Sequence, residues 1–344
     1  MIKHKISRKW IYIWIGILLT LAVAFWPTNY YIEAPGSTDQ ISNYIQDSAK
    51  HDQANPNFYL VTVSERPAGV GDYLLSFFSK NETRISKKEL LGNQNNRTYQ
   101  QMQKYFMENS QNQAIYYAAK KAGISHKMQF LGVNVINVLS NSSFKGKLQP
   151  GDLIVAANNH QFRSSNSFMN YIQSLKKTSK IKIKVLRGKN YKTFTGRLVK
   201  LNNGKYGIGI ELFDHTKVMT KPEIKINTQD IGGPSAGLMM SLVCYQLFTK
   251  ENLSPKNKIA GTGTIDKSGH VGMIGGVDKK VVAASRSGMK VFFVPSEQPQ
   301  GVRKDQTNYA EALKKAKKIH SKMKIIPVKR FDDALNYLIK YEKD

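Results

Sequence analysis

The chain has 344 residues, enough for two or three domains, and 41% of them are hydrophobic, which is ample for packed cores. The formal net charge of +28 predicts partners of opposite sign, but the lysines form no patch interleaved with aromatic residues, which argues against nucleic-acid binding. The single cysteine, Cys244, excludes an intrachain disulfide, and the seven histidines lack metal-ligand spacing, so neither a metal nor a cofactor is expected.

Residues 1–27 are predicted to form a basic cytoplasmic tail and a transmembrane anchor. An uncharged run of 17 residues, Trp10 to Trp26, follows the basic stretch, and this length is at the short end of what crosses a bilayer. The basic flank predicts a single-pass protein of the cell membrane, with a cytoplasmic N-terminus and extracellular domains. The alternative is a cleaved signal peptide, because Ala22 to Ala24 has the small-x-small form of a cleavage site. We favour the anchor, since the apolar run continues to Trp26.

Residues 28–126 carry few signals. Tyr30 to Gly36 is predicted to be extended, Phe58 to Val63 has the β-branched and aromatic content of a strand, and Tyr99 to Ala122 has apolar residues at helical spacing. Nothing in this segment indicates chemistry. We therefore predict a structural role, with the helix packing on a neighbouring domain.

Residues 127–200 show short strands around one helix. Leu131 to Val138 alternates as a strand does, Leu148 to Ile154 holds a Pro-Gly-Asp turn before another strand, and helical spacing runs from Ser167 to Leu175. Two further strands meet at the turn of Arg187 and Gly188. This order, and above all the Pro-Gly-Asp turn, resembles a bacterial PDZ domain of the protease-associated kind.

A PDZ fold binds an extended peptide by adding it as a strand beside one of its own. The resemblance predicts that Gln129 to Val135 faces the peptide, with the helix from Ser167 as the opposite wall of the groove. No Gly-Leu-Gly-Phe-type carboxylate loop precedes this strand, so recognition of a free C-terminus and of an internal segment both stay open. The predicted groove residues are Phe130, Leu131, Gly132 and Val133.

Residues 201–344 alternate between predicted strands and helices, which indicates an α/β arrangement. The whole chain is therefore expected to be α/β (α+β), with an N-terminal transmembrane helix and a β-rich PDZ-like domain before this last part. The predicted strands are Tyr206–Leu212, Glu223–Ile226, Ile259–Ile265, His270–Ile274, Met289–Pro295 and Lys324–Val328. The predicted helices are Ala236–Phe248, a helix beginning at Lys280, Tyr309–Met323 and Phe331–Tyr341.

Two Gly-rich signatures lie in this last part, Asp230 to Gly237 and Ile274 to Ala284. Gly and Pro before Ser235 suit a tight turn that presents the hydroxyl, and the apolar helix after it puts Ser235 at a helix N-terminus. A serine nucleophile needs a group that takes its proton, and a buried neutral lysine can do this without a histidine. The backbone N–H groups of Gly233 and Ser235 are candidates for binding an oxyanion.

The motif Pro-Ser235-Ala-Gly, followed after a Thr-Gly element by Gly-Gly-x-x-x-Lys280, resembles the proteolytic domain of Lon-type Ser–Lys proteases. The resemblance implies that Ser235 is the nucleophile, that Lys280 is its base and that Thr262 helps to hold the lysine amine. The neighbouring Lys279 is then expected to point away and to be solvated.

Two positions depart from the pattern of the ATP-dependent members of that family. Gly232 stands where those proteins carry an Asp immediately before Gly-Pro-Ser, and Thr264 stands where they carry an acidic residue after Thr-Gly. Asp230 lies two positions before Gly232. Contacts on the substrate side are therefore expected to differ.

The order of anchor, PDZ and Lon-like domain resembles the PDZ-containing Lon-like proteases of Gram-positive bacteria (the YlbL/SepM type). The resemblance divides the chain into 1–27, the anchor; 28–126, an extracellular linker or N-terminal part of the protease region; 127–200, the PDZ domain; and 201–344, the proteolytic domain. It implies a membrane-anchored serine endopeptidase that cleaves peptides or proteins outside the cell and can form a homo-oligomer. Independence from ATP is expected, because the chain lacks a Gly-x-x-x-x-Gly-Lys-Ser/Thr loop.

Two other classes stay open. A non-catalytic, membrane-tethered PDZ adaptor would keep the peptide groove and would not need Ser235 or Lys280. A signal-peptidase-like enzyme also pairs Ser with Lys beside a membrane helix, although the motifs around the two residues would differ.

Overall fold

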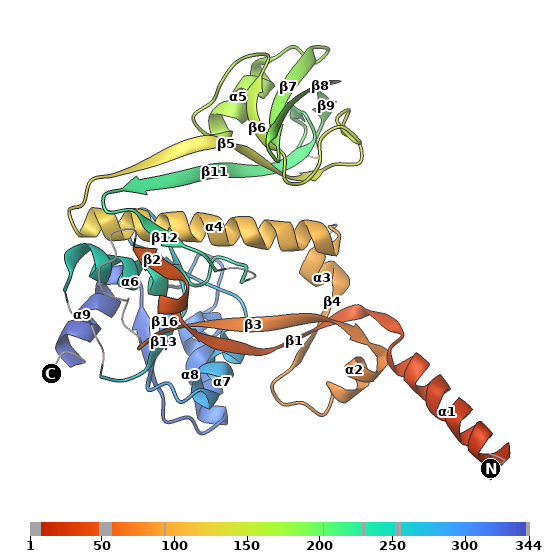
Figure 1. Cartoon of the computed structure of the whole chain (residues 1–344), viewed down its shortest axis with the longest axis vertical. Helices are drawn as coiled ribbons and strands as arrows, with labels where there is room; N and C mark the ends of the chain where they lie inside the picture. Colours follow the sequence, from red (N-terminus) through yellow and green to blue (C-terminus); the bar gives the residue numbers. More distant parts are fainter. Residues whose placement is uncertain are drawn as a thin grey trace, which may run out of the picture.

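The computed structural model describes residues 8–47, 57–92, 94–201, 203–228, 231–251, 253 and 256–341. Figure 1 shows three parts: helix α1 (Arg8–Ala24), which projects from one end, an α/β body, and a β-rich part on the other side of the long helix α4 (Asn96–Lys121). Asp230, the first residue of the predicted serine signature, lies outside the described residues.

A six-stranded mixed sheet forms the centre of the α/β body. Its strand order is β17-β16-β13-β3-β1-β4; the first four run parallel to one another, and β1 is antiparallel to both of its neighbours. Because 28–126 supplies β1, β3 and β4, this segment is part of the protease-like body. The strands are β1 (Pro27–Gln40), β3 (Phe58–Gly69), β4 (Thr83–Ser86), β13 (Ile259–Gly261), β16 (Val291–Pro295) and β17 (Lys324–Val328).

Helices cover both faces of this sheet. One core cluster joins the sheet to α4, α6 (Gly237–Thr249) and α9 (Phe331–Tyr341), and another joins it to α7 (Val277–Arg286) and α8 (Asn308–Lys318). In β16, Val291 and Phe293 pack in the first cluster, whereas Phe292 and Val294 pack in the second. This alternation is what a strand buried on both faces requires. The predicted α/β arrangement is confirmed.

Short elements connect these layers. They are η1 (Ile41–Asn43), β2 (Ile45–Asp47), α2 (Val70–Leu75), α3 (Lys87–Leu91), β12 (Ile224–Ile226), β14 (Thr264–Ile265), β15 (Val271–Gly272) and η2 (Lys304–Gln306). The predicted strand Ile259–Ile265 is divided into β13 and β14 at Gly263, whose φ of +145° and close approach to Val271 leave no room for a Cβ. This break matters below, because the chain passes the candidate nucleophile here.

The β-rich part is a five-stranded antiparallel sheet of order β11-β5-β6-β7-β8, with α5 (Ser165–Ser174) packed against it. The strands are β5 (His126–Val138), β6 (Leu153–Ala157), β7 (Lys180–Arg187), β8 (Asn190–Arg197) and β11 (Ile210–Thr220), with a small ladder of β9 (Val199–Lys200) and β10 (Tyr206–Gly207) beside them. Because β11 pairs along β5, this sheet continues to residue 220, beyond the predicted boundary at 200. Asp152 of the Pro-Gly-Asp turn is fully buried and binds Arg187 through two hydrogen bonds of 2.6 and 2.8 Å.

The predicted peptide strand is wrong. The strand Gln129 to Val135, which includes Phe130, Leu131, Gly132 and Val133, has β11 along one edge and β6 along the other at Val133 and Asn134. A peptide cannot add where the chain's own strands pair. Within the described residues, the edge strands of this sheet are β11 and β8, and the edge beside α5 belongs to β11. A Gly-Ile-Gly-Ile run, Gly207 to Ile210, leads into β11.

Helix α5 is tied to that open edge. Its first backbone N–H, at Ser165, donates a hydrogen bond of 2.6 Å to the Asp214 carboxylate of β11. The alternation of Leu131 to Val138 identifies a strand correctly, but it carries no information about which strands become its neighbours. The pattern therefore could not show that β11, about 80 residues later, pairs along the edge of β5 at which the peptide was expected.

Helix α1 has the same length as the predicted apolar run, 17 residues, but begins two residues earlier, at Arg8. It ends at Ala24, and Pro27 begins β1, since a residue before proline disfavours the helical conformation. Seventeen residues give a helix of about 25 Å, against about 30 Å for the hydrocarbon core of a bilayer. None of the helices in the described part of the chain has both the length and the apolar character needed to cross a membrane.

Candidate active site

Ser235 lies between a tight turn and the N-terminus of α6. Gly233 has a φ of +83°, a left-handed conformation that glycine adopts without strain, and α6 begins at Gly237. The Ser235 carbonyl accepts hydrogen bonds from the N–H of Gly263 at 2.8 Å and from the Thr262 hydroxyl at 3.1 Å. These bonds fix the serine at the carboxyl end of β13.

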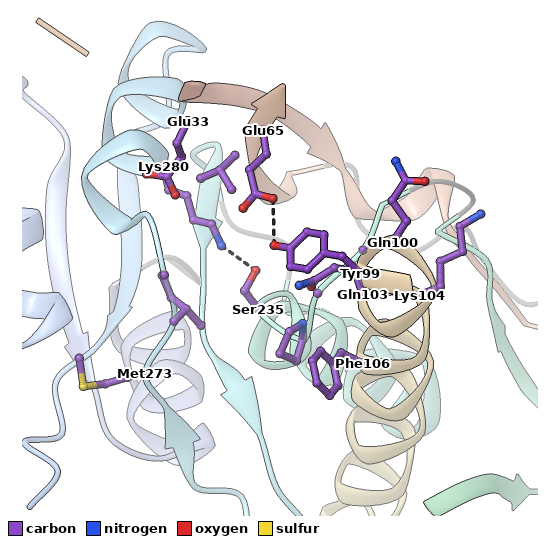
Figure 2. A pocket seen from close by; sticks show the side chains of 16 residues that line it. Glu33, Glu65, Tyr99, Gln100, Gln103, Lys104, Phe106, Ser235, Met273 and Lys280 are labelled. Atoms are coloured by element: carbon purple, nitrogen blue, oxygen red, sulfur yellow. Dashed lines mark hydrogen bonds between the residues drawn. The ribbon is translucent and has the colours of Figure 1, made fainter. Parts of the chain in front are cut away.

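Lys280 reaches Ser235 from the helix layer on the opposite face of the sheet. It lies near the start of α7 and is 2% exposed, and a hydrogen bond of 2.6 Å joins its Nζ to Ser235 Oγ (Figure 2). Burial lowers the pKa of the Lys280 amine from 10.5 to about 7, and the Glu33 carboxylate opposes this effect. Half of the amines are therefore neutral near pH 7, and a neutral amine can accept the serine proton.

Thr262 orients the amine. Its Oγ1 accepts a hydrogen bond of 3.0 Å from Lys280 Nζ and donates its own proton to the Ser235 carbonyl. When one N–H of the neutral amine is held by Thr262, the nitrogen lone pair is free for the Ser235 hydroxyl. Thr262 is fully buried, so no water competes for these bonds.

Gly233 does not have the predicted oxyanion-binding role, because its N–H is already used. It donates a hydrogen bond of 2.9 Å to the backbone carbonyl of Gln103 in α4. Among the described residues, no acceptor pairs with the N–H of Ser235 or of Ala236, and Pro234 has no N–H. Both groups lie at the N-terminus of α6, where negative charge is favoured, so they are the candidate oxyanion donors.

A cavity of about 840 Å³ opens onto Ser235 and Lys280. Part of its lining comes from 28–126, to which the sequence analysis assigned no chemistry: Glu33 of β1, Glu65 of β3 and Tyr99 of α4 (Figure 2). Glu33 and Glu65 face each other across the β1–β3 ladder, and the Tyr99 hydroxyl donates to Glu65 at 3.0 Å. Burial raises the pKa of Glu33, and burial with the nearby Glu65 charge raises the pKa of Tyr99. The sequence signal that could have identified Glu33 is its position as the one charged residue in the stretch Tyr30 to Pro35.

Lys279 is not solvated, contrary to the prediction. It is 4% exposed, and its Nζ lies 2.7 Å from a carboxylate oxygen of Asp278 and 3.7 Å from one of Glu33. The prediction failed because it considered α7 alone, whereas β1 packs on this helix and brings Glu33 to it. The ammonium of Lys279 therefore balances part of the carboxylate charge beside Lys280.

Helix α4 links the candidate active site to the PDZ-like sheet. On one side, the Ser110 hydroxyl donates a hydrogen bond of 2.9 Å to the carbonyl of Pro234, the residue before Ser235. On the other side, the Asn112 amide donates to the carbonyl of Thr216 at 2.8 Å and accepts from the N–H of Val218 at 3.0 Å, both in β11. One rigid helix thus holds the nucleophile turn and the edge strand together.

Comparison with known proteins agrees with this architecture. A family model described as the Lon protease (S16) C-terminal proteolytic domain matches residues 168–341, and a PDZ domain model matches 121–198. The Lon protease of Koribacter versatilis is 35% identical over 136 residues, which cover 36% of this chain and 16% of that protein. The Lon protease of Trichlorobacter lovleyi is 38% identical over 103 residues, which cover 30% of this chain and 11% of that protein. The chain thus matches only a small part of the length of these relatives.

Among solved structures, the PDZ domain of an SdrC-like protein from Listeria monocytogenes is 32% identical, with 25% of this chain and 92% of that chain covered and a TM-score of 0.24.

The match to the proteolytic-domain family model spans just over half of the chain and contains both Ser235 and Lys280. The chain therefore belongs to the family of the Lon protease (S16) C-terminal proteolytic domain, and it carries a PDZ domain as well.

Proposed function

We propose that the protein is an ATP-independent serine endopeptidase that uses Ser235 and Lys280 as a catalytic dyad. The observation that carries the proposal is the 2.6 Å hydrogen bond between Ser235 Oγ and a buried amine whose pKa is lowered to about 7. No Gly-x-x-x-x-Gly-Lys-Ser/Thr loop occurs in the sequence, so cleavage is expected without added nucleotide.

The reaction is an acyl transfer in two steps. Lys280 Nζ takes the hydroxyl proton as Ser235 Oγ attacks the peptide carbonyl carbon, and the oxyanion that forms accepts hydrogen bonds from the N–H groups of Ser235 and Ala236. The ammonium then returns the proton to the leaving amine as the C–N bond breaks. Water hydrolyses the ester in the second step, with Lys280 again as the base, and Ser235 is regenerated.

The PDZ domain is proposed to recruit the peptide or protein substrate. The edge of β11 beside α5 suits strand addition before Thr216, where Asn112 of α4 begins to bind the strand. The glycine-containing turn Gly207 to Gly209 before β11 can offer backbone N–H groups to a terminal carboxylate. Because α4 contacts both β11 and the Ser235 turn, a peptide held at this edge would be presented by a part that is fixed relative to the nucleophile.

We further propose that α1 holds the protein at the cell membrane, with the catalytic domain on the extracellular side. Its apolar side chains are exposed, including Trp10, Leu18 and Val23 at 58, 63 and 59%, and the basic residues before them favour a cytoplasmic N-terminus. Phe25 and Trp26, exposed after the end of the helix, extend the apolar length.

The experiment that tests the peptidase is cleavage of a peptide mixture by the full chain without nucleotide, measured by mass spectrometry. Ser235→Ala should abolish every cleavage, whereas Ser287→Ala, at the exposed C-terminal end of α7, should leave the products unchanged. Cleavage that persists in Ser235→Ala, or its absence from the unmodified chain across many peptides, would support the PDZ adaptor instead. Ser235→Ala should still bind the substrates of the unmodified chain.

A further inference from the structure

An exposed apolar surface lies outside the active site, on α2 and the turn that follows it. Leu74, Leu75, Phe77 and Phe78, here called the α2 patch, are 56, 70, 58 and 87% exposed. Single exposed apolar residues are common on soluble proteins, but four large ones within five positions are a contiguous surface that calls for a partner.

The α2 patch is part of an ordered structure. The Tyr73 ring packs on Tyr30 of β1 at 4.8 Å and on Phe77 at 5.4 Å, and the Arg84 guanidinium lies 3.9 Å above the centre of the Phe77 ring. The first turn of α2 is held as well, since Asp72 binds Arg66, which lowers the pKa of Asp72. The apolar side chains are therefore presented from a fixed base.

The α2 patch adjoins the apolar helix α1. The N–H of Val70 donates a hydrogen bond of 3.0 Å to the Trp26 carbonyl. A Cβ at Gly69 would lie 2.6 Å from the Ala24 carbonyl oxygen, and one at Gly71 would lie 3.2 Å from the Ala24 Cβ, so the two glycines let the end of α1 approach closely. Figure 1 shows α1 and α2 at the same end of the body.

Cations border the α2 patch. Lys80 lies two positions after Phe78, and Lys87 and Lys88 begin α3; all three are exposed. The carboxylates in this region are those of Asp72, Glu82 and Glu89, and the guanidinium groups of Arg66 and Arg84 lie there too. With the three lysines, five cations and three carboxylates leave a net charge of +2. An apolar surface bordered by lysines matches the acyl and headgroup layers of an anionic bilayer.

We propose that the α2 patch is a lipid-contact surface that lies at the boundary of headgroups and acyl chains of an anionic membrane. The occupant is lipid because this surface is continuous with α1, whose side chains are apolar and exposed around the helix. The inference rests on the membrane part of the proposed function and not on the peptidase. Two contacts, α1 and the α2 patch, then fix how the body is oriented on the membrane.

The test places an environment-sensitive fluorophore on a single introduced cysteine of the full chain, in vesicles of phosphatidylcholine and phosphatidylglycerol. The natural Cys244 is fully buried and does not compete for the label. The test site is Phe78→Cys, the matched control is Tyr191→Cys on β8 of the PDZ sheet, 64% exposed, and Leu18→Cys reports on α1. Thermal unfolding of each variant checks that it folds.

The proposal predicts a blue-shifted emission at position 78 that spin-labelled lipids quench by at least about twofold, more strongly with phosphatidylglycerol present, and no change at position 191. Emission at 78 equal to that at 191, with the label at 18 inside the bilayer, would overturn the α2 proposal and leave the anchor intact. A shift at 78 that appears without lipid and grows with protein concentration would also overturn it, because a second protein copy would then cover the surface. A label at 18 that stays in water would contradict the anchor and would also overturn the α2 proposal, which rests on it.

Discussion

Replacing the buried amine of Lys280 should abolish activity and stabilise the fold near neutral pH. Methionine has a similar length and needs no charge or hydrogen bond. The pKa of the amine falls from 10.5 to about 7 on folding, so burying it costs about 5 kcal/mol at or below pH 7. Loss of the hydrogen bonds to Ser235 and Thr262 costs about 1 kcal/mol each. Lys280→Met should therefore raise the free energy of unfolding by about 3 kcal/mol at pH 7.

The sign of the pH dependence follows from proton binding. Between pH 7 and pH 10.5 the unfolded chain keeps the Lys280 proton and the folded chain releases it, so the natural protein gains stability as pH rises, by about 1.4 kcal/mol per pH unit. The advantage of Lys280→Met should then shrink above pH 7 and vanish near about pH 9.

Urea unfolding of both proteins at about pH 6.5, 8 and 9.5 measures this difference. The matched control is Lys279→Met, which removes a neighbouring buried ammonium that carboxylates of Asp278 and Glu33 accompany, and which should keep the pH slope of the natural protein. A stability difference for Lys280→Met that is independent of pH, or a destabilisation at pH 7, would refute the buried neutral amine.

Three further changes test the surroundings of the dyad. Glu33→Gln should move the acid limb of the kcat/KM profile to lower pH, because the Glu33 carboxylate raises the pKa of Lys280; a limb that stays in place or moves to higher pH would contradict this effect. Thr262→Val keeps the side-chain shape but loses both hydrogen bonds of the hydroxyl, and kcat for peptide cleavage should fall about 10- to 100-fold with little change in KM, whereas an unchanged kcat would exclude a positioning role. Ser110→Ala should lower kcat roughly tenfold, because the Pro234 carbonyl loses its bond to α4, and a thermal unfolding curve measures the accompanying loss of about 1 kcal/mol.

The sequence predicted those features that local patterns determine. The apolar run after Ser235 gives α6, and the short apolar run within Met289 to Pro295 gives a buried strand. The two Gly-rich signatures identify Ser235 and Lys280, which the structure brings within 2.6 Å. Each of these inferences depends on residues within about a dozen positions of one another, or on a motif that a family preserves in order.

The features that the sequence missed depend on contacts between distant segments. Glu33 reaches Lys279 across nearly 250 positions, Gln103 takes the N–H of Gly233 across 130, and β11 pairs with β5 although the PDZ helix lies between them. Periodicity shows which face of a strand is buried, but not which strand lies beside it. The candidate oxyanion donors, the N–H groups of Ser235 and Ala236, and the candidate peptide-binding edge of β11 could therefore be identified only from the structure.

The central claim is that the Lys280 amine is neutral near pH 7 and accepts the proton of Ser235. The most direct measurement is a pH titration of the lysine Cε resonances by NMR in the ¹³C-lysine-labelled protein, with Lys280→Met used to assign the Lys280 signal. This signal should titrate with a pKa of about 7, and kcat/KM should rise with the same midpoint. A Lys280 signal that stays protonated up to the ordinary lysine value of 10.5 would contradict it.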